Sequence, residues 1–227
     1  MRDFFPEWRT ADWPMNWNAV FGRTAPRTVE VGFGNGEFLV DLARSRPDED
    51  FLGIEIAWGS VTRLLRRIEN ASLTNVRVLQ GDGAFLLARV FPPESLTRVV
   101  ANNSDPWPKD RHARRRVIQP PFARAAAACL KPGGVLHVAT DDVPYAAQID
   151  EVLRGEAALL NLNAPDAWLD EVEGRLQTGY EEDWRAAGRP LHFFEYARPL
   201  EGGPVDTSMV AGEARAERSW PVKTGRP

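Results

Sequence analysis

The chain has 227 residues, 43% of them hydrophobic and 26% charged, which are ordinary values for one globular domain with terminal extensions. Its 32 acidic residues outnumber its 28 Lys and Arg, so the formal net charge is −4, which disfavours general coating of nucleic acid. No stretch approaches the roughly 18 consecutive apolar residues of a membrane span. Cys129 is the only cysteine, which excludes an internal disulfide and a cysteine-rich zinc site, and no metal is expected.

The start of the chain lacks the apolar core of a signal peptide, so the expected compartment is the cytoplasm. Residues 1–27 read as an N-terminal extension rich in Trp and Pro, for which packing over the domain is favoured over stacking on RNA bases or an interface role. Residues 28–198 are expected to form an α/β domain, and residues 199–227, with little apolar content, a mobile tail. The sequence leaves a monomer and a homodimer equally open.

Residues 28–31 are a short β-prone run that ends in a loop with glycines at Gly32, Gly34 and Gly36. Apolar residues at helical spacing follow this loop. The order of strand, glycine loop and helix opens a nucleotide-binding sheet, because closely spaced glycines let the backbone approach a ligand. A tight turn without a ligand is the alternative for this loop alone.

Acidic residues stand at the carboxyl ends of four predicted strands, and they are Glu30, Glu55, Asp82 and Asp105. The second, third and fourth strands are predicted at residues 51–56, 76–80 and 96–101. Glu55 follows Gly36 by 19 residues, which matches the spacing of an acidic residue that binds ribose hydroxyls. Ligands bind outside the carboxyl ends of parallel strands, so the four carboxylates together predict a ligand site, although each alone could be a solvated loop residue.

Residues 103–116 combine a carboxylate with a strongly basic run. Asp105 stands directly before Pro106 and close to Pro108, and both prolines stiffen the backbone. Five basic residues and one acidic residue give residues 109–116 a net charge of +4, which favours a focused contact with a polyanion. The last arginines are expected at the start of the next helix, where the helix dipole disfavours cations unless phosphates bind. A solvated loop leading into a basic helix start is the alternative.

The second half of the chain continues the alternation of helices and strands. We expect a helix over residues 118–129, a strand over residues 135–140 that ends in Asp141, and a late strand over residues 191–196. His137, in the middle of its strand, is interpreted as a packed core histidine and not as a catalyst. These elements predict an α/β fold with an open, mostly parallel sheet.

Several motifs together resemble one family. They are Glu-x-Gly-x-Gly-x-Gly-Glu (30–37), Gly-Ile-Glu (53–55), Gly-Asp (81–82), Asp-Pro-Trp-Pro-Lys-x-Arg-His-x-x-Arg-Arg (105–116), Lys-Pro-Gly-Gly (131–134), Thr-Asp (140–141) and Thr-x-Tyr-Glu (178–181). Over roughly residues 28–197 the chain resembles the bacterial tRNA (guanine-N7-)-methyltransferases, and the Asp-Pro-Trp-Pro-Lys block is the specific part. The resemblance implies a class I methyltransferase fold, Rossmann-like, with about seven strands and helices on both faces. It also implies S-adenosylmethionine as cofactor, tRNA as partner, and methyl transfer to N7 of a guanosine in the variable loop (position 46).

The resemblance assigns roles to individual residues of this chain. Asp105 is implied as the catalytic residue. The implied cofactor-binding residues are Glu30, Gly32, Gly34, Gly36, Glu55, Asp82 and Asp105. The implied substrate-binding residues are Lys109, Asp141, Thr178 and Glu181. The implied RNA-binding residues are Arg111, His112, Arg114, Arg115 and Arg116.

The chain departs from the family pattern at two places. Asn103 and Ser104 replace the apolar residue and the proline that usually precede Asp-Pro-Trp, which changes the wall of the base pocket. Tyr180 replaces a phenylalanine, with Gly179 beside it. Two other functions therefore stay open: methylation of another nucleobase nitrogen or of a small molecule, and RNA binding without catalysis.

Overall fold

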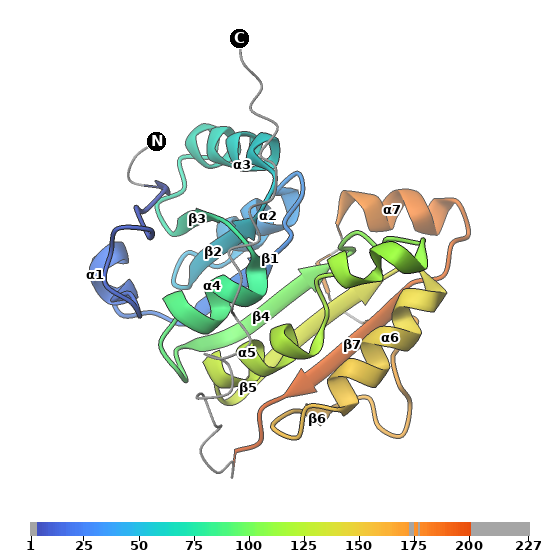
Figure 1. Ribbon diagram of the computed structural model, residues 1–227. Coiled ribbons are helices and arrows are strands. Elements are labelled where there is room, and N and C mark those ends of the chain that lie inside the picture. Colours follow the sequence, from blue (N-terminus) through green and yellow to red (C-terminus); the bar gives the residue numbers. More distant parts are fainter. Residues whose placement is uncertain (1–3, 173–174, 177, 201–227) are drawn as a thin grey trace.

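The computed structural model describes residues 4–172, 175–176 and 178–200, and it contains one seven-stranded sheet with the strand order β3-β2-β1-β4-β5-β7-β6 (Figure 1). The strands are β1 (Arg27–Val31), β2 (Asp50–Glu55), β3 (Val76–Gln80), β4 (Leu96–Asn102), β5 (Leu130–Thr140), β6 (Leu160–Asn161) and β7 (His192–Ala197). The first five strands pair in parallel, and β7 runs antiparallel to both β5 and β6. The predicted α/β class with a mostly parallel sheet of about seven strands is confirmed.

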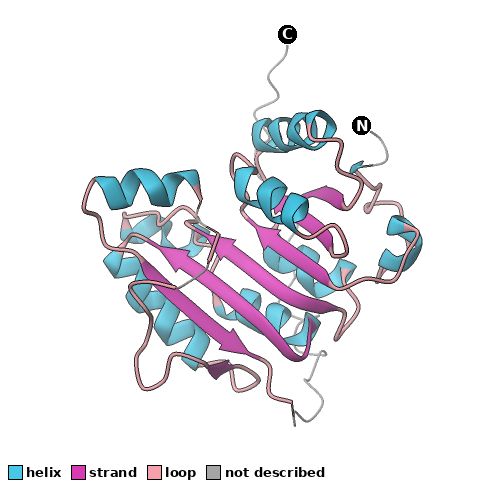
Figure 2. Ribbon diagram, turned by 180° about the vertical axis from the view of Figure 1, so that it is seen from behind, coloured by secondary structure: helices cyan, strands magenta, loops and turns pink. Residues whose placement is uncertain are grey.

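Helices cover both faces of the sheet. They are α1 (Trp17–Phe21), α2 (Glu37–Ser45), α3 (Trp58–Asn70), α4 (Gly83–Val90), the 3-10 helix η2 (Asp110–Arg115), α5 (Pro120–Cys129), α6 (Val143–Arg154) and α7 (Gly179–Ala186). The face covered by α4, α5 and α6 is turned to the viewer in Figure 1, and the opposite face, with α2, α3 and α7, in Figure 2. On α3 the apolar residues Val61, Leu64, Leu65 and Ile68 recur at helical spacing, and all are buried against the sheet.

The strand order reverses between β1 and β4. The chain proceeds from β1 to β2 and β3 on one side, and from β4 to β5 on the other. The loops that follow β1 and β4 therefore separate at their carboxyl ends and leave room for a ligand between them. A Cβ placed on Gly32 would lie 3.9 Å from the Cβ of Ser104, so the two loops are adjacent in space.

The N-terminal segment packs against the domain. Trp8, Met15 and Trp17 are buried and belong to the larger hydrophobic core, and the ring of Trp17 stacks on that of Phe91 at 5.0 Å. Aromatic packing, the favoured interpretation of residues 1–27, agrees with these contacts. The expected mobile tail falls almost entirely on residues 201–227, which lie outside the described residues.

Two expectations drawn from local pattern are wrong. Arg114 and Arg115 lie in the last turn of η2, six and five positions before α5 begins at Pro120, so the argument from a helix N-terminus does not apply. His137 is not packed in the apolar core: its side chain is 26% exposed, and its Nδ1 lies 3.2 Å from Glu195 Oε1 on the neighbouring strand β7. The pattern of apolar neighbours could not reveal a charged partner that is 58 residues away in the sequence.

Candidate active site

The glycine loop after β1 is built from backbone that only glycine adopts easily. Gly32, Gly34 and Gly36 all have positive φ, between 54° and 75°. A Cβ on Gly36 would stand 2.7 Å from Leu64 Cδ1, so this glycine lets α2 pack closely on α3. No heavy atom of the described residues lies within 4 Å of the position of a Cβ on Gly34. The middle of the loop is therefore open to an approaching ligand.

A small cavity lies against this loop and joins it to the loop after β4 and to the segment before α7. Its lining residues are Glu30, Gly32, Phe33, Gly34, Asn35, Gly36, Glu37, Phe38, Asn102, Asn103 and Thr178. It thus unites four predicted cofactor residues with one predicted substrate residue, Thr178. The sequence could not place Thr178 in the same cavity as Glu30, because their proximity depends on how the segment before α7 folds back over the sheet.

Glu30 is the most strongly perturbed group in the cavity. Its side chain is buried at 2% exposure, its Oε1 accepts a hydrogen bond from Asn102 Nδ2 at 3.3 Å, and no described residue donates to its Oε2. Desolvation by burial raises the pKa of Glu30 to about 8, against smaller lowering effects of Asn102 and Arg175. A buried carboxylate oxygen without a donor at a cavity wall fits a cationic or hydrogen-donating ligand group.

Glu55 and Asp82 are both anchored by backbone. Glu55 Oε1 accepts from Ile56 N and Ala57 N at 2.8 and 3.0 Å, and Oε2 accepts from Gly34 N at 3.3 Å, which ties the end of β2 to the glycine loop. Asp82 Oδ1 caps α4 by accepting from Phe85 N at 2.8 Å. A carboxylate has about four acceptor positions, so both groups keep capacity for a ligand.

The loop after β4 carries Asp105 at the surface and is held from beneath. Asp105 itself is exposed. Ser104 Oγ lies 3.2 Å from the hydroxyl of Tyr145 on α6, and that hydroxyl accepts from Ile118 N at 3.0 Å. Ser104, which replaces the proline of the family pattern, thus gives the loop a polar anchor in place of ring stiffness.

Arg116 closes the other end of this loop. Its Nε donates to the carbonyl oxygen of Pro106 at 2.6 Å, its Nη1 donates to Gln148 Oε1, and its guanidinium lies over the ring of Tyr145. The donors of Arg116 are therefore directed at the chain itself. Its predicted contact with RNA stays a prediction, while its geometry indicates that it fastens the Asp-Pro-Trp-Pro turn to α6.

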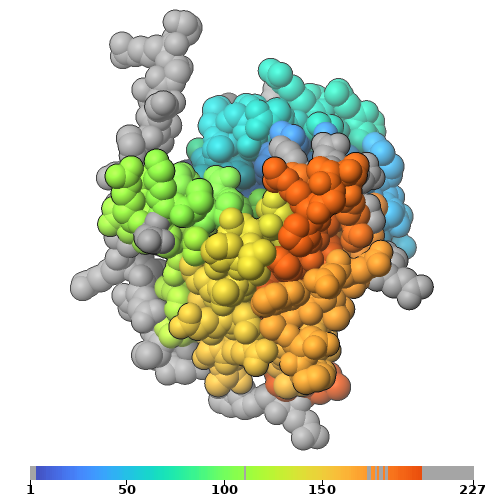
Figure 3. All heavy atoms as spheres, turned by 90° about the vertical axis from the view of Figure 1, so that its right-hand side faces the viewer, coloured from blue at the N-terminus to red at the C-terminus, as the bar shows by residue number. Residues whose placement is uncertain are grey.

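The remaining cations of the basic segment lie at the surface. Lys109, Arg111, Arg114 and Arg115 are exposed, and His112 is partly buried. The ring of Trp107 meets His112 edge-on at 5.7 Å and lies under the guanidinium of Arg115 at 4.9 Å. Figure 3 shows this segment, in green, as a projecting edge beside α6 in yellow. Of the two interpretations of Trp107, these contacts favour a packing anchor over base stacking.

The predicted substrate residues fall into separate environments. Thr178 and Glu181 are buried together: Thr178 N donates to Glu181 Oε2, and Glu181 N donates to Thr178 Oγ1, at 3.3 and 3.2 Å. Asp141, at the end of β5, lies 3.2 Å from Arg189 Nη1. Lys109 is exposed on the loop after β4. Only Thr178 of these four residues lines the cavity.

The sequence did not predict three polar residues of the site as binding residues. Asn102 and Asn103 line the cavity, and Arg175 lies behind them with its Nη1 2.5 Å from Glu181 Oε2. Asn103 adopts a positive φ of 48°, which asparagine tolerates better than most residues, and donates to Glu181 Oε1 at 3.4 Å. The departure from the family pattern at Asn103 was visible in the sequence, but its partner was not.

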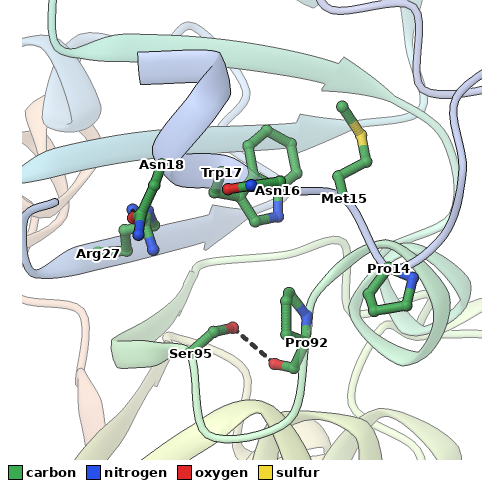
Figure 4. A pocket seen from close by; sticks show the side chains of 8 residues that line it. All are labelled: Pro14, Met15, Asn16, Trp17, Asn18, Arg27, Pro92 and Ser95. Carbon is green, nitrogen blue, oxygen red and sulfur yellow. Dashed lines mark hydrogen bonds between the residues drawn. The ribbon is translucent and has the colours of Figure 1, made fainter. Parts of the chain in front are cut away.

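A second hollow lies at the opposite, amino end of the sheet, between the N-terminal segment and the loop before β4 (Figure 4). It is lined by Pro14, Met15, Asn16, Trp17, Asn18, Arg27, Pro92 and Ser95. Its one charged residue, Arg27, donates to Asn18 Oδ1 and lies 3.7 Å from Asp50 Oδ2. None of the predicted site residues borders this hollow, and the guanidinium of Arg27 already contacts Asn18 and Asp50.

Comparisons with known proteins agree with this geometry. A family described as "Putative methyltransferase" matches residues 24–194. The tRNA (guanine-N(7)-)-methyltransferase of Methylococcus capsulatus is 44% identical over 181 residues, which cover 79% of this chain and 78% of the relative. The enzyme of the same name from Alkalilimnicola ehrlichii is 46% identical over 185 residues, covering 82% and 78%. The chain belongs to the tRNA (guanine-N(7)-)-methyltransferase family. The resemblance drawn from the motifs is thereby confirmed, and with it the prediction of an enzyme.

Solved structures support the fold at lower identity. The crystal structure of TrmN from Thermus thermophilus superposes with a TM-score of 0.55 at 17% identity, covering 77% of this chain and 44% of that chain. The aminoglycoside resistance methyltransferase NpmB1 gives a TM-score of 0.53 at 18% identity, covering 76% and 87%. This chain therefore shares its fold with these methyltransferase structures. Among the described residues there is no cluster of three or more His, Cys, Asp or Glu that could hold a metal ion, and no helix there is long and apolar enough to cross a membrane.

Proposed function

We propose that this member of the tRNA (guanine-N(7)-)-methyltransferase family transfers a methyl group from S-adenosylmethionine to N7 of a guanosine in the variable loop of tRNA, at position 46. The observation that carries the proposal is the single cavity that unites the glycine loop and Glu30 with Thr178. The family motifs imply the cofactor for the first group and the substrate for the second. One cavity for both is what a transfer between two bound molecules requires.

The cofactor half suits S-adenosylmethionine, which when bound supplies a methyl group activated on a sulfonium sulfur. The open backbone at Gly34 accommodates a close ligand, and Glu30 offers the buried oxygen that no described residue donates to. Glu55 stands at the end of β2, where an acidic residue of this fold binds ribose hydroxyls. Asp82 and Asp105 complete the set of carboxylates that we assign to the cofactor.

Asp105 acts by position and charge and not as a general base. Guanine N7 has an in-plane lone pair, so it needs no deprotonation before it attacks a methyl group. Positive charge grows on the purine during that attack, and a nearby carboxylate favours this redistribution. Asp105 is exposed two residues after Asn103, which lines the cavity, on a loop fastened by Ser104 and Arg116, and this suits orientation of an incoming base.

The projecting basic segment contacts the RNA backbone. Lys109, Arg111 and Arg114 are exposed within six residues of one another and contribute a local positive charge on an acidic protein. Asp141, Thr178 and Glu181 complete the assigned substrate residues, with His112, Arg115 and Arg116 the remaining RNA-binding assignments. A guanosine stacked inside a folded tRNA must be drawn out to reach the cavity, since enzymes that modify a base generally extrude it.

The proposal extends to the organisation of the chain and its place of action. Residues 28–198 form the methyltransferase domain, and residues 1–27 are an N-terminal extension whose Trp8, Met15 and Trp17 pack on it. A tRNA substrate is consistent with action in the cytoplasm.

The test is direct. Purified protein is incubated with S-adenosylmethionine and unmodified bulk tRNA, and the digested nucleosides are measured by mass spectrometry. We expect N7-methylguanosine that depends on both protein and cofactor, and fragment mapping should place it in the variable loop. A methylated product other than N7-methylguanosine would replace the proposal with another nucleobase, and no product together with no cofactor binding would favour an RNA-binding protein without catalysis.

A further inference from the structure

Two buried carboxylates from distant parts of the chain lie near the cavity: Glu30 lines it, and Glu181 is bonded to its lining residue Thr178. Glu30, on β1, is 2% exposed, and Glu181, on α7, is fully buried. Arg175 stands between them. Its Nη1 lies 2.5 Å from Glu181 Oε2, and its Nη2 donates to Asn102 Oδ1. Asn102 then donates to Glu30 Oε1, so one guanidinium and one amide connect the two acids.

The amide of Asn102 has only one orientation that satisfies both neighbours. Its oxygen faces the guanidinium of Arg175, which can only donate, and its NH2 group therefore faces the carboxylate of Glu30. An ionised Glu30 can only accept, so it favours the same orientation of the amide, and Arg175 reinforces it by donating to the amide oxygen. Arg175 thus helps to fix the group that donates to the buried acid of the cofactor half.

The guanidinium of Arg175 is held in a fixed place. Its side chain is 13% exposed, and its centre lies 4.8 Å from the ring of Phe193 and 5.8 Å from that of Phe38. One cation serves two buried carboxylates, so the cluster carries an excess negative charge when both are ionised. A positively charged ligand group at Glu30 would neutralise that excess charge, and Arg175 would then pair with Glu181 alone.

We propose that Arg175 is a positioning residue that couples binding of the cofactor at Glu30 to binding of the target base at Thr178 and Glu181. The inference rests on the proposed function, because it assigns those two ligands to the two halves of the cavity. Once a cation compensates Glu30, Arg175 holds Glu181 more firmly. Glu181 in turn fixes Thr178 through two hydrogen bonds, each between the backbone N–H of one residue and the side chain of the other, so the first ligand prepares the site for the second.

A purely structural role for Arg175 makes a different prediction. A buried ion pair that only stabilises the fold would, when broken, lower thermal stability without changing how one ligand affects the other. The pH dependence of cofactor binding separates the two roles as well. Arg175 lowers the pKa of Glu30, so its removal should move the pH dependence of binding at Glu30 upward.

The experiment measures coupling and not turnover. The probe is sinefungin, an unreactive analogue that carries an amine in place of the sulfonium methyl. Calorimetry gives the affinity of unmodified tRNA for the protein with and without saturating sinefungin, and the ratio of the two affinities is the coupling factor. In the wild type we expect sinefungin to tighten tRNA binding by about fivefold or more, within the usual range of coupling between sites.

Arg175→Gln should weaken the binding of both sinefungin and tRNA and bring the coupling factor close to one. Asn102→Ala keeps the ion pair with Glu181 but removes the bridge to Glu30, and it should lower the factor in the same way, which keeps the test valid if Arg175→Gln folds poorly. Arg27→Gln is the matched control, since it breaks a comparably buried pair with Asp50 at the far end of the sheet and should leave the factor unchanged.

The outcomes separate the inference from the function beneath it. A coupling factor of one in the wild type, or an unchanged factor in both Arg175→Gln and Asn102→Ala, overturns the role of Arg175 while the proposed function stands. Failure of the wild type to bind sinefungin at all overturns the proposed function and the inference together.

Discussion

The two halves of the candidate site, the cavity and the loops around it, are built by different means. The cofactor half is made largely of backbone: three glycines with positive φ, and carboxylates such as Glu55 that are held by neighbouring amides. The substrate half is made of side chains that meet across the fold, since Asn103 reaches Glu181 across 78 positions and Ser104 reaches Tyr145 across 41. The first half therefore depends on local conformation and the second on tertiary contacts.

This difference divides the expected effects of mutation. Substitutions in the cofactor half should change cofactor binding through the backbone geometry and through the charge of a few carboxylates. Substitutions in the substrate half should act through loss of a long-range contact, and their effects should depend on their partners. Four experiments, together with the coupling experiment above, test this comparison.

The largest effect is expected from Asp105→Asn. The side chain keeps its size and loses its charge, so turnover at saturating tRNA and cofactor should fall about 100-fold or more if the carboxylate offsets charge on the purine. Sinefungin affinity should change little by comparison. Asp48→Asn, at an exposed carboxylate in the turn before β2, is the control. Turnover of Asp105→Asn near that of the wild type would show that no carboxylate charge is needed.

The next effect concerns RNA binding. A triple variant with Lys109, Arg111 and Arg114 changed to Ala should bind tRNA tens of times more weakly at low salt, because each cation displaces counterions from phosphates. The slope of log affinity against log salt should flatten by about two to three, with sinefungin affinity unchanged. The matched control changes exposed arginines on α2, α3 and α6, namely Arg44, Arg66 and Arg154. Equal losses in both triples would mean that the basic segment is not the RNA contact.

The pH dependence of stability should report the titration of Glu30. Burial raises the pKa of Glu30 to about 8 from an ordinary 4.5. Because the folded-state pKa is the higher one, its contribution to stability is complete below the unfolded value and is lost as pH rises through about 8. The wild type should therefore lose stability relative to Glu30→Gln between about pH 5 and about pH 9, as measured by urea unfolding. A difference that stays constant over this range would place the titration elsewhere.

The same contrast explains how far the sequence predicted the molecule. Local periodicity and glycine spacing predicted the sheet, its order of strand and helix, and the carboxylates at the strand ends, because these depend on neighbours in the chain. Arg175 could not be predicted, since nothing near it in sequence distinguishes it from an exposed arginine, and its partner Asn102 is 73 positions away. The inward direction of Arg116 was missed for the same reason, although its neighbours in the basic segment do lie at the surface.

The smallest effect is expected beneath the loop that carries Asp105. Tyr145→Phe removes a buried hydroxyl that accepts from Ile118 N and bonds Ser104 Oγ, so it leaves two buried polar groups without their partner. The free energy of unfolding should fall by about 1–3 kcal/mol. Ser104→Ala alone should cost less, and Ser104→Ala in the Tyr145→Phe background almost nothing more, because the shared hydrogen bond is already lost. The double-mutant cycle measured by urea unfolding tests this, and strictly additive effects would show that Ser104 and Tyr145 do not act together. The same cycle measured on the KM for tRNA separates loop anchoring from simple stability, since a loosened loop presents Asp105 less well to an incoming base.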